Sequence, residues 1–394
     1  MKKLMLVAAV TIASVSAHAS KARLDSLQNA AQLEDFTYAF DGRAEDTLNY
    51  EAALVEFGGS GSYSSPDAEG GFIRKMGDAA LGFYMGKPST SLATGVSSFA
   101  DAYGTTTDEK TVIKKALGQS NPIEVTYAAK AGDMAWGVGL FATGSDQKLF
   151  TANSGTEYMQ GKITQNIYGV YAGVNAGAWD AQVRAGLQGD TKFTGNGNAT
   201  YNTMAGLGTT DEIKIQSTGN VKVSGRYRMD TMTYYASYES LAGNIKVNGV
   251  KKSDTTNDTT TVGVVDSKKK DGVDFFYGVS LVSNVAKDKD ATVTANQEID
   301  TFSMPLLVGV EADANSWLTL RGAISQNLPF ASSVKYKGTG SGATAVASTT
   351  TTLGAGIKWG KATIDGVLGM GSTGQFGTDN ASNMFTNAAL TYNF

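Results

Sequence analysis

The chain has 394 residues, with 33 Lys and Arg against 37 Asp and Glu, a formal charge of −4, one His and no Cys. This mildly acidic balance gives no indication of nucleic-acid binding, and the lack of Cys excludes disulfides, a thiol nucleophile and an iron–sulfur cluster. The 47 Gly, 17 Tyr and 16 Phe suit a large antiparallel sheet. They would suit a helical protein badly, because each interior Gly costs a helix about 1 kcal/mol.

The first 19 residues have the pattern of a secretory signal peptide. Lys2-Lys3 form a basic start, a short apolar run follows, and Ala17-His18-Ala19 is an A-x-A cleavage site. The run is too short to span a bilayer, and no later stretch approaches 18 continuous apolar residues. We therefore expect an exported chain that begins at Ser20 and, having lost both lysines, carries a formal charge of −6.

Cleavage would also remove the single His, at position 18. Without imidazole there is no His base and no His metal ligand, which excludes most hydrolase chemistry. No remaining nucleophile has a base beside it in the sequence. We therefore predict that the protein is not an enzyme and holds no cofactor or metal.

The mature chain opens with a helical pattern over residues 21–36, in which Leu24, Leu27 and Ala31 share one face. Two interpretations stay open: a short periplasmic helix that caps or plugs a barrel, or a mobile leader helix. We assign residues 20–45 to this N-terminal segment and residues 46–394 to a β-barrel.

Tight turns punctuate the rest of the chain. Residues 75–82 (KMGDAALG) resemble residues 130–137 (KAGDMAWG) at five of eight positions. Gly, Asp and Asn are the residues that hairpin turns need, because they tolerate positive φ. Seven such turns are centred at positions 77, 132, 177, 230, 270, 314 and 360.

Longer polar stretches separate these turns, near residues 59–67, 88–120, 145–161, 190–214, 244–257, 286–296, 329–347 and 373–382. Eight long loops and seven short turns predict about 16 strands, within a range of 14 to 18. One weak strand, residues 258–268, is included partly to keep the parity. Alternation of short and long connections is typical of an up-and-down transmembrane β-barrel with short periplasmic turns. The predicted fold class is therefore all-β, with a short N-terminal periplasmic helix.

Between the turns, apolar and polar residues alternate with a period of two, as in residues 178–188, where Trp179, Val183 and Leu187 oppose Asp180 and Arg184. A soluble sandwich also alternates, but it rarely strings about 16 strands into one series. In a membrane barrel the apolar face must meet lipid. The charged residues of the opposite face are therefore predicted to line the lumen: Glu124, Lys130, Asp180, Arg184, Lys222, Arg226, Arg228, Asp274, Arg321 and Asp365.

The last strand, residues 383–394, carries Leu390, Tyr392 and Phe394 on one face. It resembles the terminal strands of Gram-negative outer-membrane β-barrels, which end on an aromatic residue. That resemblance implies recognition of these three residues by the barrel-assembly machinery.

The mature start, residues 21–28 with Asp35 and Phe36, together with Phe394, resembles the porin-like major outer-membrane proteins of predatory Gram-negative bacteria. It is more faintly similar to the fatty-acid transporter group, whose N-terminal segment plugs a 14-stranded barrel. The resemblance implies an outer-membrane location and contact with outer-membrane lipid and lipopolysaccharide. Trimers are usual for porins of this width, so the resemblance allows a homotrimer, although no residue pattern identifies a trimer face.

A barrel of about 16 strands is too wide for side chains to fill. The first functional hypothesis is therefore a porin for passive diffusion of small hydrophilic solutes, with Asp101, Asp108 and Glu109 of the loop 88–120 as a candidate constriction. By resemblance to general porins this loop would face the wall arginines; alternatively it packs outside. Two other hypotheses stay open: a substrate-specific or hydrophobic-solute channel plugged by residues 21–36, and a surface structural or adhesive barrel.

Overall fold

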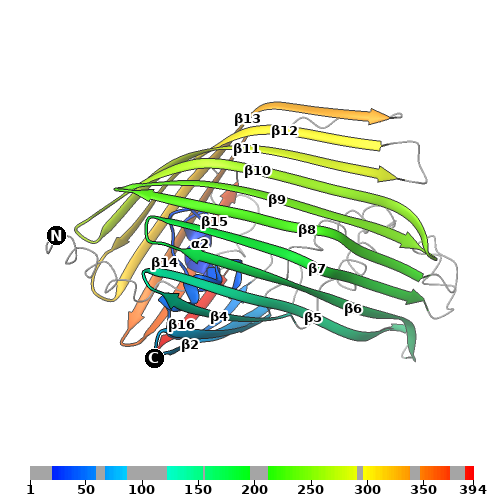
Figure 1. Cartoon of the computed structure of the whole chain (residues 1–394), viewed down its shortest axis with the longest axis horizontal. Coiled ribbons are helices and arrows are strands. Elements are labelled where there is room, and N and C mark those ends of the chain that lie inside the picture. Colours follow the sequence, from blue (N-terminus) through cyan, green and yellow to red (C-terminus); the bar gives the residue numbers. More distant parts are fainter. Residues whose placement is uncertain are drawn as a thin grey trace.

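The computed structural model describes residues 20–58, 67–86, 122–153, 156–195, 212–290, 296–337, 347–372 and 387–394. Over these residues sixteen antiparallel strands form one closed barrel, in which each strand pairs with its sequence neighbours and β16 pairs with β1 (Figure 1). The predicted fold and strand number are confirmed. The strands are β1 Ala52–Gly58, β2 Asp67–Met76, β3 Ala79–Met85, β4 Ile123–Ala131, β5 Met134–Asn153, β6 Thr156–Asn175, β7 Trp179–Gly195, β8 Glu212–Met229, β9 Met232–Val247, β10 Val250–Lys270, β11 Val273–Asp290, β12 Asn296–Asp313, β13 Leu318–Lys337, β14 Ser348–Trp359, β15 Ala362–Ser372 and β16 Asn387–Asn393.

The seven tight turns lie where the sequence predicted them, at the left end of the barrel in Figure 1. Six of them contain a residue with positive φ, the conformation for which Gly and Asp were expected: Gly77, Gly132, Gly177, Asp230, Asp271 with Gly272, and Gly360. The seventh, between β12 and β13, is held instead by the Asn315 side chain, which accepts hydrogen bonds from the backbone N–H groups of Trp317 and Leu318.

At the opposite end the strands run further than predicted. Residues 244–257, expected as a long loop, form the ends of β9 and β10 around a two-residue turn at Asn248-Gly249, both with positive φ. Most of 145–161 likewise belongs to β5 and β6. Polar residues do not end a strand whose backbone is paired on both sides, as Thr256 is paired with Ala242 and Lys287. The weak strand at 258–268 is confirmed within β10.

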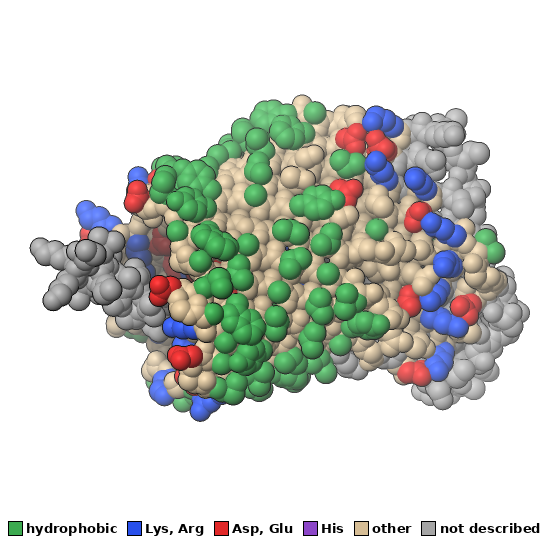
Figure 2. Space-filling model, viewed as in Figure 1, with side chains coloured by type: hydrophobic (Ala, Val, Ile, Leu, Met, Phe, Trp, Pro, Cys, Tyr) green, Lys and Arg blue, Asp and Glu red, His purple; other side chains and the backbone are tan. Residues whose placement is uncertain are grey.

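The two faces of the barrel wall separate as the alternation predicted. Trp179, Val183 and Leu187 are 44%, 43% and 61% exposed, whereas Arg226 is 5% exposed. Figure 2 shows apolar side chains gathered as a belt over the outer surface, with charged side chains toward both ends of the barrel. The long-loop side of this belt carries exposed cross-strand ion pairs, such as Lys192–Glu212 and Lys335–Glu298.

Among the described residues, three short helices precede β1: α2 Lys21–Ser26, and the 3-10 helices η2 Phe36–Phe40 and η3 Ala44–Asn49. In Figure 1 they lie inside the barrel, near the end formed by the tight turns. No helix in the described part of the chain is long and apolar enough to cross a membrane.

Candidate functional site

The candidate site is the lumen of the barrel and the chain segment inside it, residues 20–50, which we call the plug. Most of the plug is buried although it belongs to no sheet. Some of its backbone groups bond within the segment, others bond to side chains of the wall, and its own side chains also reach the wall. The sequence left two interpretations of the N-terminal segment open, a helix that plugs the barrel and a mobile leader. In the structure this segment lies inside the barrel.

The plug is folded by local capping rather than by one helix. Ser20 caps α2 by accepting a hydrogen bond from the backbone N–H of Arg23, and Asp35 caps η2 by accepting one from that of Thr37. The helix predicted over 21–36 stops at Ser26, because Gln28 and Asn29 adopt φ of 56° and 52°. This left-handed turn reverses the chain and lets a short sequence touch several sides of the lumen.

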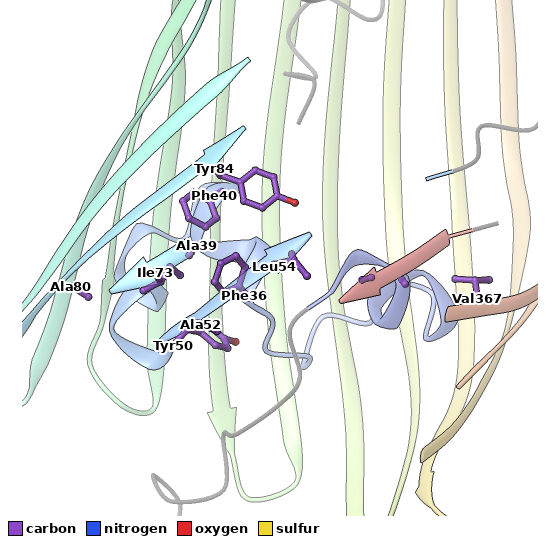
Figure 3. Close-up of a cluster of buried hydrophobic side chains, with 12 residues drawn as sticks. Phe36, Ala39, Phe40, Tyr50, Ala52, Leu54, Ile73, Ala80, Tyr84 and Val367 are labelled. Atoms are coloured by element: carbon purple, nitrogen blue, oxygen red, sulfur yellow. The ribbon is translucent and has the colours of Figure 1, made fainter. Parts of the chain in front are cut away.

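An aromatic cluster fixes the plug to the first strands of the wall (Figure 3). The ring centroids of Phe40 and Tyr84 of β3 are 4.9 Å apart, and those of Phe36 and Phe40 are 5.6 Å apart. Phe36, Phe40 and Tyr84 are fully buried. Each large buried aromatic side chain stabilises such packing by several kcal/mol, about 3–5 when truncated to Ala.

A second apolar cluster lies under α2 on another side of the lumen. Leu24, Leu27 and Leu33 of the plug pack with Val265 of β10 and Phe276 of β11. Tyr235 of β9 and Leu307 of β12 pack against the same cluster. Phe276 alternates with the exposed Phe275 and Tyr277 along β11, and its ring faces inward onto the plug.

Charged side chains of β7 and β8 form ion pairs and hydrogen bonds with the part of the plug between the two clusters. The guanidinium of Arg226 lies 2.8 Å from the Asp180 carboxylate, and it donates to the carbonyl oxygens of Ala31 and Leu33. Arg226 and Arg228 both contact Glu34, at 3.1 Å and 3.0 Å. A buried guanidinium with several acceptors fixes orientation, because its donors form a rigid fork.

A second charged group joins α2 to the last strands. Arg23 pairs with Glu311 of β12 at 2.9 Å, and Glu311 also pairs with Arg321 of β13 at 2.6 Å. Arg321 pairs in turn with Asp365 of β15 at 2.6 Å. The Ser20 hydroxyl donates to Asp365 at 3.0 Å, so this group binds the beginning of the plug.

Further contacts complete the circuit of the wall, each joining one plug residue to one or two strands. The plug partners are Lys21 and Ala22 for β1, Lys21 for β2, Thr47 for β4, Ala44 for β5, Glu45 for β6 and β7, Gln28 for β13 and β14, and Asp25 for β16. With the groups above, the plug touches all sixteen strands. A solute can therefore pass this level of the lumen only between plug and wall or after the plug has moved.

Glu45 of η3 is a plug residue whose protonation is coupled to docking. Its carboxylate accepts a hydrogen bond from Gln182 of β7 at 2.9 Å, and it faces Gly173 of β6. Burial raises the pKa of Glu45 to about 7, and the neighbouring Asp180 carboxylate adds to the rise. Docking therefore favours the protonated acid.

Two cavities lie between the plug and the wall, on either side of the turn at residues 28–31. The first, of about 260 Å³, is lined by the cationic side chains of Arg43, Arg184, Lys222 and Arg226, by Asp41, and by several neutral groups. The second, of about 270 Å³, lies between β9 and β13 and has more apolar walls, including Val265, Leu306 and Leu307. Together they follow the side of the lumen formed by β7 to β13.

The predicted pore-lining residues fall into three groups. Those that lie buried inside the barrel are Glu124, Asp180, Arg226, Arg321 and Asp365. Arg184 and Arg228 are half-buried and contact the plug, and Lys222 lines the first cavity. Lys130 is exposed near the Gly132 turn, and Asp274 accepts a hydrogen bond from Ser267 near the Gly272 turn. The candidate constriction residues Asp101, Asp108 and Glu109 lie outside the described residues.

Sequence patterns had not identified Arg23, Asp35, Glu45 or Glu311 as part of the site. Their signal was weak: Asp35 and Glu45 stand in acidic pairs, Glu34-Asp35 and Glu45-Asp46, in a segment with no strand alternation. The partners of Glu34 and Glu45 lie on β8 and β7, 194 and 137 residues away, whereas Asp35 is bonded to Ser20, Arg23 and Thr37 within the plug.

A scan of protein-family models gives no match, and no curated protein matches the chain. Several solved structures match the chain. CdiB from Acinetobacter baumannii is 8% identical with a TM-score of 0.45; the match covers 88% of this chain and 60% of CdiB. The Ralstonia pickettii toluene transporter TbuX is 14% identical with a TM-score of 0.38, over 97% and 99% of the two chains. OmpT, an outer membrane protein of Vibrio cholerae, is 13% identical with a TM-score of 0.33, over 87% and 95%. Similarity at this level carries no conclusion about solute or mechanism.

Proposed function

We propose that the protein is an outer-membrane channel whose lumen is gated by its own N-terminal plug. The apolar belt between two charged ends supports a membrane location, because a closed barrel leaves no unpaired backbone for lipid to meet. On this placement the exposed Lys and Glu side chains beyond the belt contact lipid headgroups and lipopolysaccharide, and β16 presents Leu390, Tyr392 and Phe394 outward, each about half exposed.

The observation that carries the proposal is the plug's contact with all sixteen strands. A permanently open diffusion porin needs a free water-filled path, and here the path at the tight-turn end passes through a packed segment. A gated channel needs a segment that fills the lumen and can leave it. The plug's many separate contacts with the wall, and the absence of any sheet pairing in the plug, support this proposal.

The cavity between plug and wall indicates the class of solute. Its lining includes Arg43, Arg184, Lys222 and Arg226, with Asp41 as the acidic member. Arg43, Arg184 and Arg226 are already paired with Asp46, Glu124 and Asp180, so Lys222 is the cation that a solute can reach without displacing one of these pairs. A small polar solute that carries a carboxylate or phosphate group would pair with this ammonium group. We propose small hydrophilic anions as the preferred solutes.

Planar-bilayer conductance of the purified protein tests the gate. The wild-type protein should give small or rare current steps, and a variant lacking residues 20–50 should give large ones. Thr47 of the plug and Thr126 of β4 have hydroxyl oxygens 3.0 Å apart, and the chain has no Cys. Replacing both with Cys allows a single disulfide, which should abolish the openings until it is reduced.

The reduced double variant is the matched control for the disulfide. Large, constant steps from the wild-type protein that persist in the oxidised variant would favour the open diffusion porin over the gated channel. Absence of steps from the wild-type, reduced and truncated proteins would instead support a barrel with a structural or adhesive role. Reversal potentials in a salt gradient then test whether anions pass preferentially, and Lys222→Glu should reduce that preference.

A further inference from the structure

Ser20, the residue directly after the predicted cleavage site, is built into the interface between plug and wall. It is fully buried. Its hydroxyl donates to Asp365 of β15 and accepts from the backbone N–H of Arg23. Its backbone nitrogen lies 3.0 Å from a carboxylate oxygen of Asp35, which is also fully buried. A residue at the end of a leader would ordinarily be exposed.

The charges around Ser20 form a closed ring that lacks one positive charge. The ring runs through Asp35, Arg23, Glu311, Arg321 and Asp365, and Ser20 closes it by bonding to both Asp365 and Asp35. It thus contains three carboxylates and two guanidinium groups. A buried ion network with an unbalanced charge is costly.

The surroundings make the shortage larger. Glu56 of β1 approaches the same end of α2 and accepts hydrogen bonds from the backbone N–H groups of Lys21 and Ala22. Burial raises the pKa of Asp35 to about 7, although Arg23 and the hydrogen bonds from Thr37 and Ser20 oppose the rise. A further cation beside Asp35 would keep this carboxylate ionised.

We propose that hydrolysis of the Ala19–Ser20 bond supplies the missing charge, so that the α-ammonium group of Ser20 pairs with Asp35 and locks the plug in the lumen. A signal peptidase would add water across the bond. The water oxygen goes to Ala19, which leaves as a carboxylate, and both water hydrogens end on the Ser20 nitrogen, which becomes an ammonium group. In the uncleaved chain the group that Ser20 offers to Asp35 is a neutral amide.

Signal-peptide cleavage and docking of the plug are then coupled. The hydrolysis that removes the signal peptide also creates the ammonium group that holds the plug in the lumen. This inference goes beyond the proposed channel function and does not depend on conduction. It would hold for a plugged barrel that transports nothing, and its test measures no current.

The test is the reactivity of the Ser20 amine toward an acylating reagent. The mature protein is purified from the outer membrane, its first residue is identified by mass spectrometry, and it is acylated folded and in denaturant. We expect Ser20 to react at least about tenfold more slowly in the folded barrel, because access requires local opening of the plug. Lys361, exposed in the last tight turn, should react at similar rates in both states.

Two variants separate the ion pair from simple burial. Asp35→Asn removes the partner, and one Ala inserted between Ala19 and Ser20 moves the ammonium group by about 3.8 Å while leaving every side chain of the ring in place. Both should raise the folded-state rate about tenfold, whereas Asp78→Asn, in an exposed turn, should not. The insertion keeps the test valid if Asp35→Asn fails to fold.

Three results would each overturn the proposal. The mature chain could begin at another residue; the Ser20 amine of the wild-type barrel could react as fast as in denaturant; or the insertion variant could react as slowly as the wild type.

Discussion

At the scale of single residues, buried charged side chains hold the plug in place. Arg226 is 5% exposed and Asp180 is 2% exposed, and Arg226 also binds two carbonyl oxygens of the plug. A buried ion pair adds little when it is compared with apolar residues of the same size, but removing one partner leaves the other uncompensated. The loss of one side chain should therefore be felt strongly at this position.

Arg226→Ala should loosen the plug, because Asp180 would stay buried without its main partner. The expected cost is about 3–5 kcal/mol of docking free energy. Large current steps should become frequent, and protease added from the tight-turn side should cut within residues 20–50. Lys214→Ala, which removes a partly exposed partner of Asp190, is the control and should leave both measurements unchanged. Equal behaviour of the two variants would contradict the role of Arg226.

At this scale the sequence predicted which side of the wall a residue faces but not what it touches. Alternation placed Asp180, Arg226, Arg321 and Asp365 inward, and they lie buried inside. Glu34, which pairs with Arg226, and Arg23, which pairs with Glu311, both sit on a segment with no strand period. Arg23 is 288 positions from Glu311. No local pattern encodes a pairing over that separation, so the charge networks emerged only from the structure.

At the scale of elements, a pair of glycines makes room for η3. Gly137 of β5 and Gly173 of β6 are cross-strand partners in the wall. A Cβ atom on Gly137 would collide with the backbone of Ala44, and one on Gly173 would collide with the Glu45 carboxylate. The close approach of η3 to β5 and β6 therefore requires glycine, which has no Cβ atom, at both positions.

Gly137→Val should displace η3 from the wall, because the new side chain would occupy the position of the Ala44 backbone. The barrel itself should still form, since Val suits a strand. We expect more frequent openings without loss of the heat-modifiable barrel band on electrophoresis. Gly144→Val, on the same strand where a Cβ makes only ordinary contacts, is the matched control. Unchanged gating in Gly137→Val would argue against this contact as a constraint.

Element boundaries were predictable where turn chemistry sets them and not elsewhere. Glycine and aspartate fixed the tight turns to within a residue or two, because positive φ excludes most other residues. Polar composition misplaced the far strand ends, as at 244–257, because backbone pairing tolerates Thr and Asn. The helix over 21–36 was overextended because its apolar period continues past the left-handed turn at Gln28 and Asn29.

On the scale of the whole molecule, the outer belt sets the barrel's place in a bilayer. Val183→Arg would put a charge within the belt, at a position 43% exposed, and should destabilise the barrel in lipid by about 2–4 kcal/mol. Urea unfolding in vesicles measures this change. Asn166→Arg, exposed on β6 toward the charged end, should cost less. Equal costs would remove the support for a lipid-facing belt.

The docked plug should also respond to pH as a unit. The pKa of Glu45 is raised on docking from 4.5 to about 7, so its contribution is fully present below about 4.5 and is lost as pH rises through 7. The opening frequency should therefore increase between pH 5 and pH 8, by up to roughly 70-fold if it follows the docking equilibrium. In Glu45→Gln this dependence should become weaker, and the neighbouring Asp46, whose pKa burial also raises, should account for what remains. A rise of the same size in that variant would assign the effect to another group.

The closure of the sheet has a consequence for the order in which the molecule is made. β16 pairs with β15 through five residues and with β1 through seven, a short seam compared with β5 and β6. Ser20, Asp25 and the N–H groups of α2 bond to β15, β16 and β1 and so clasp both sides of that seam. The binding surface for the start of the plug therefore does not exist until β16 has paired with β1. The plug is synthesised before the strands, but it can dock fully only after the barrel has closed.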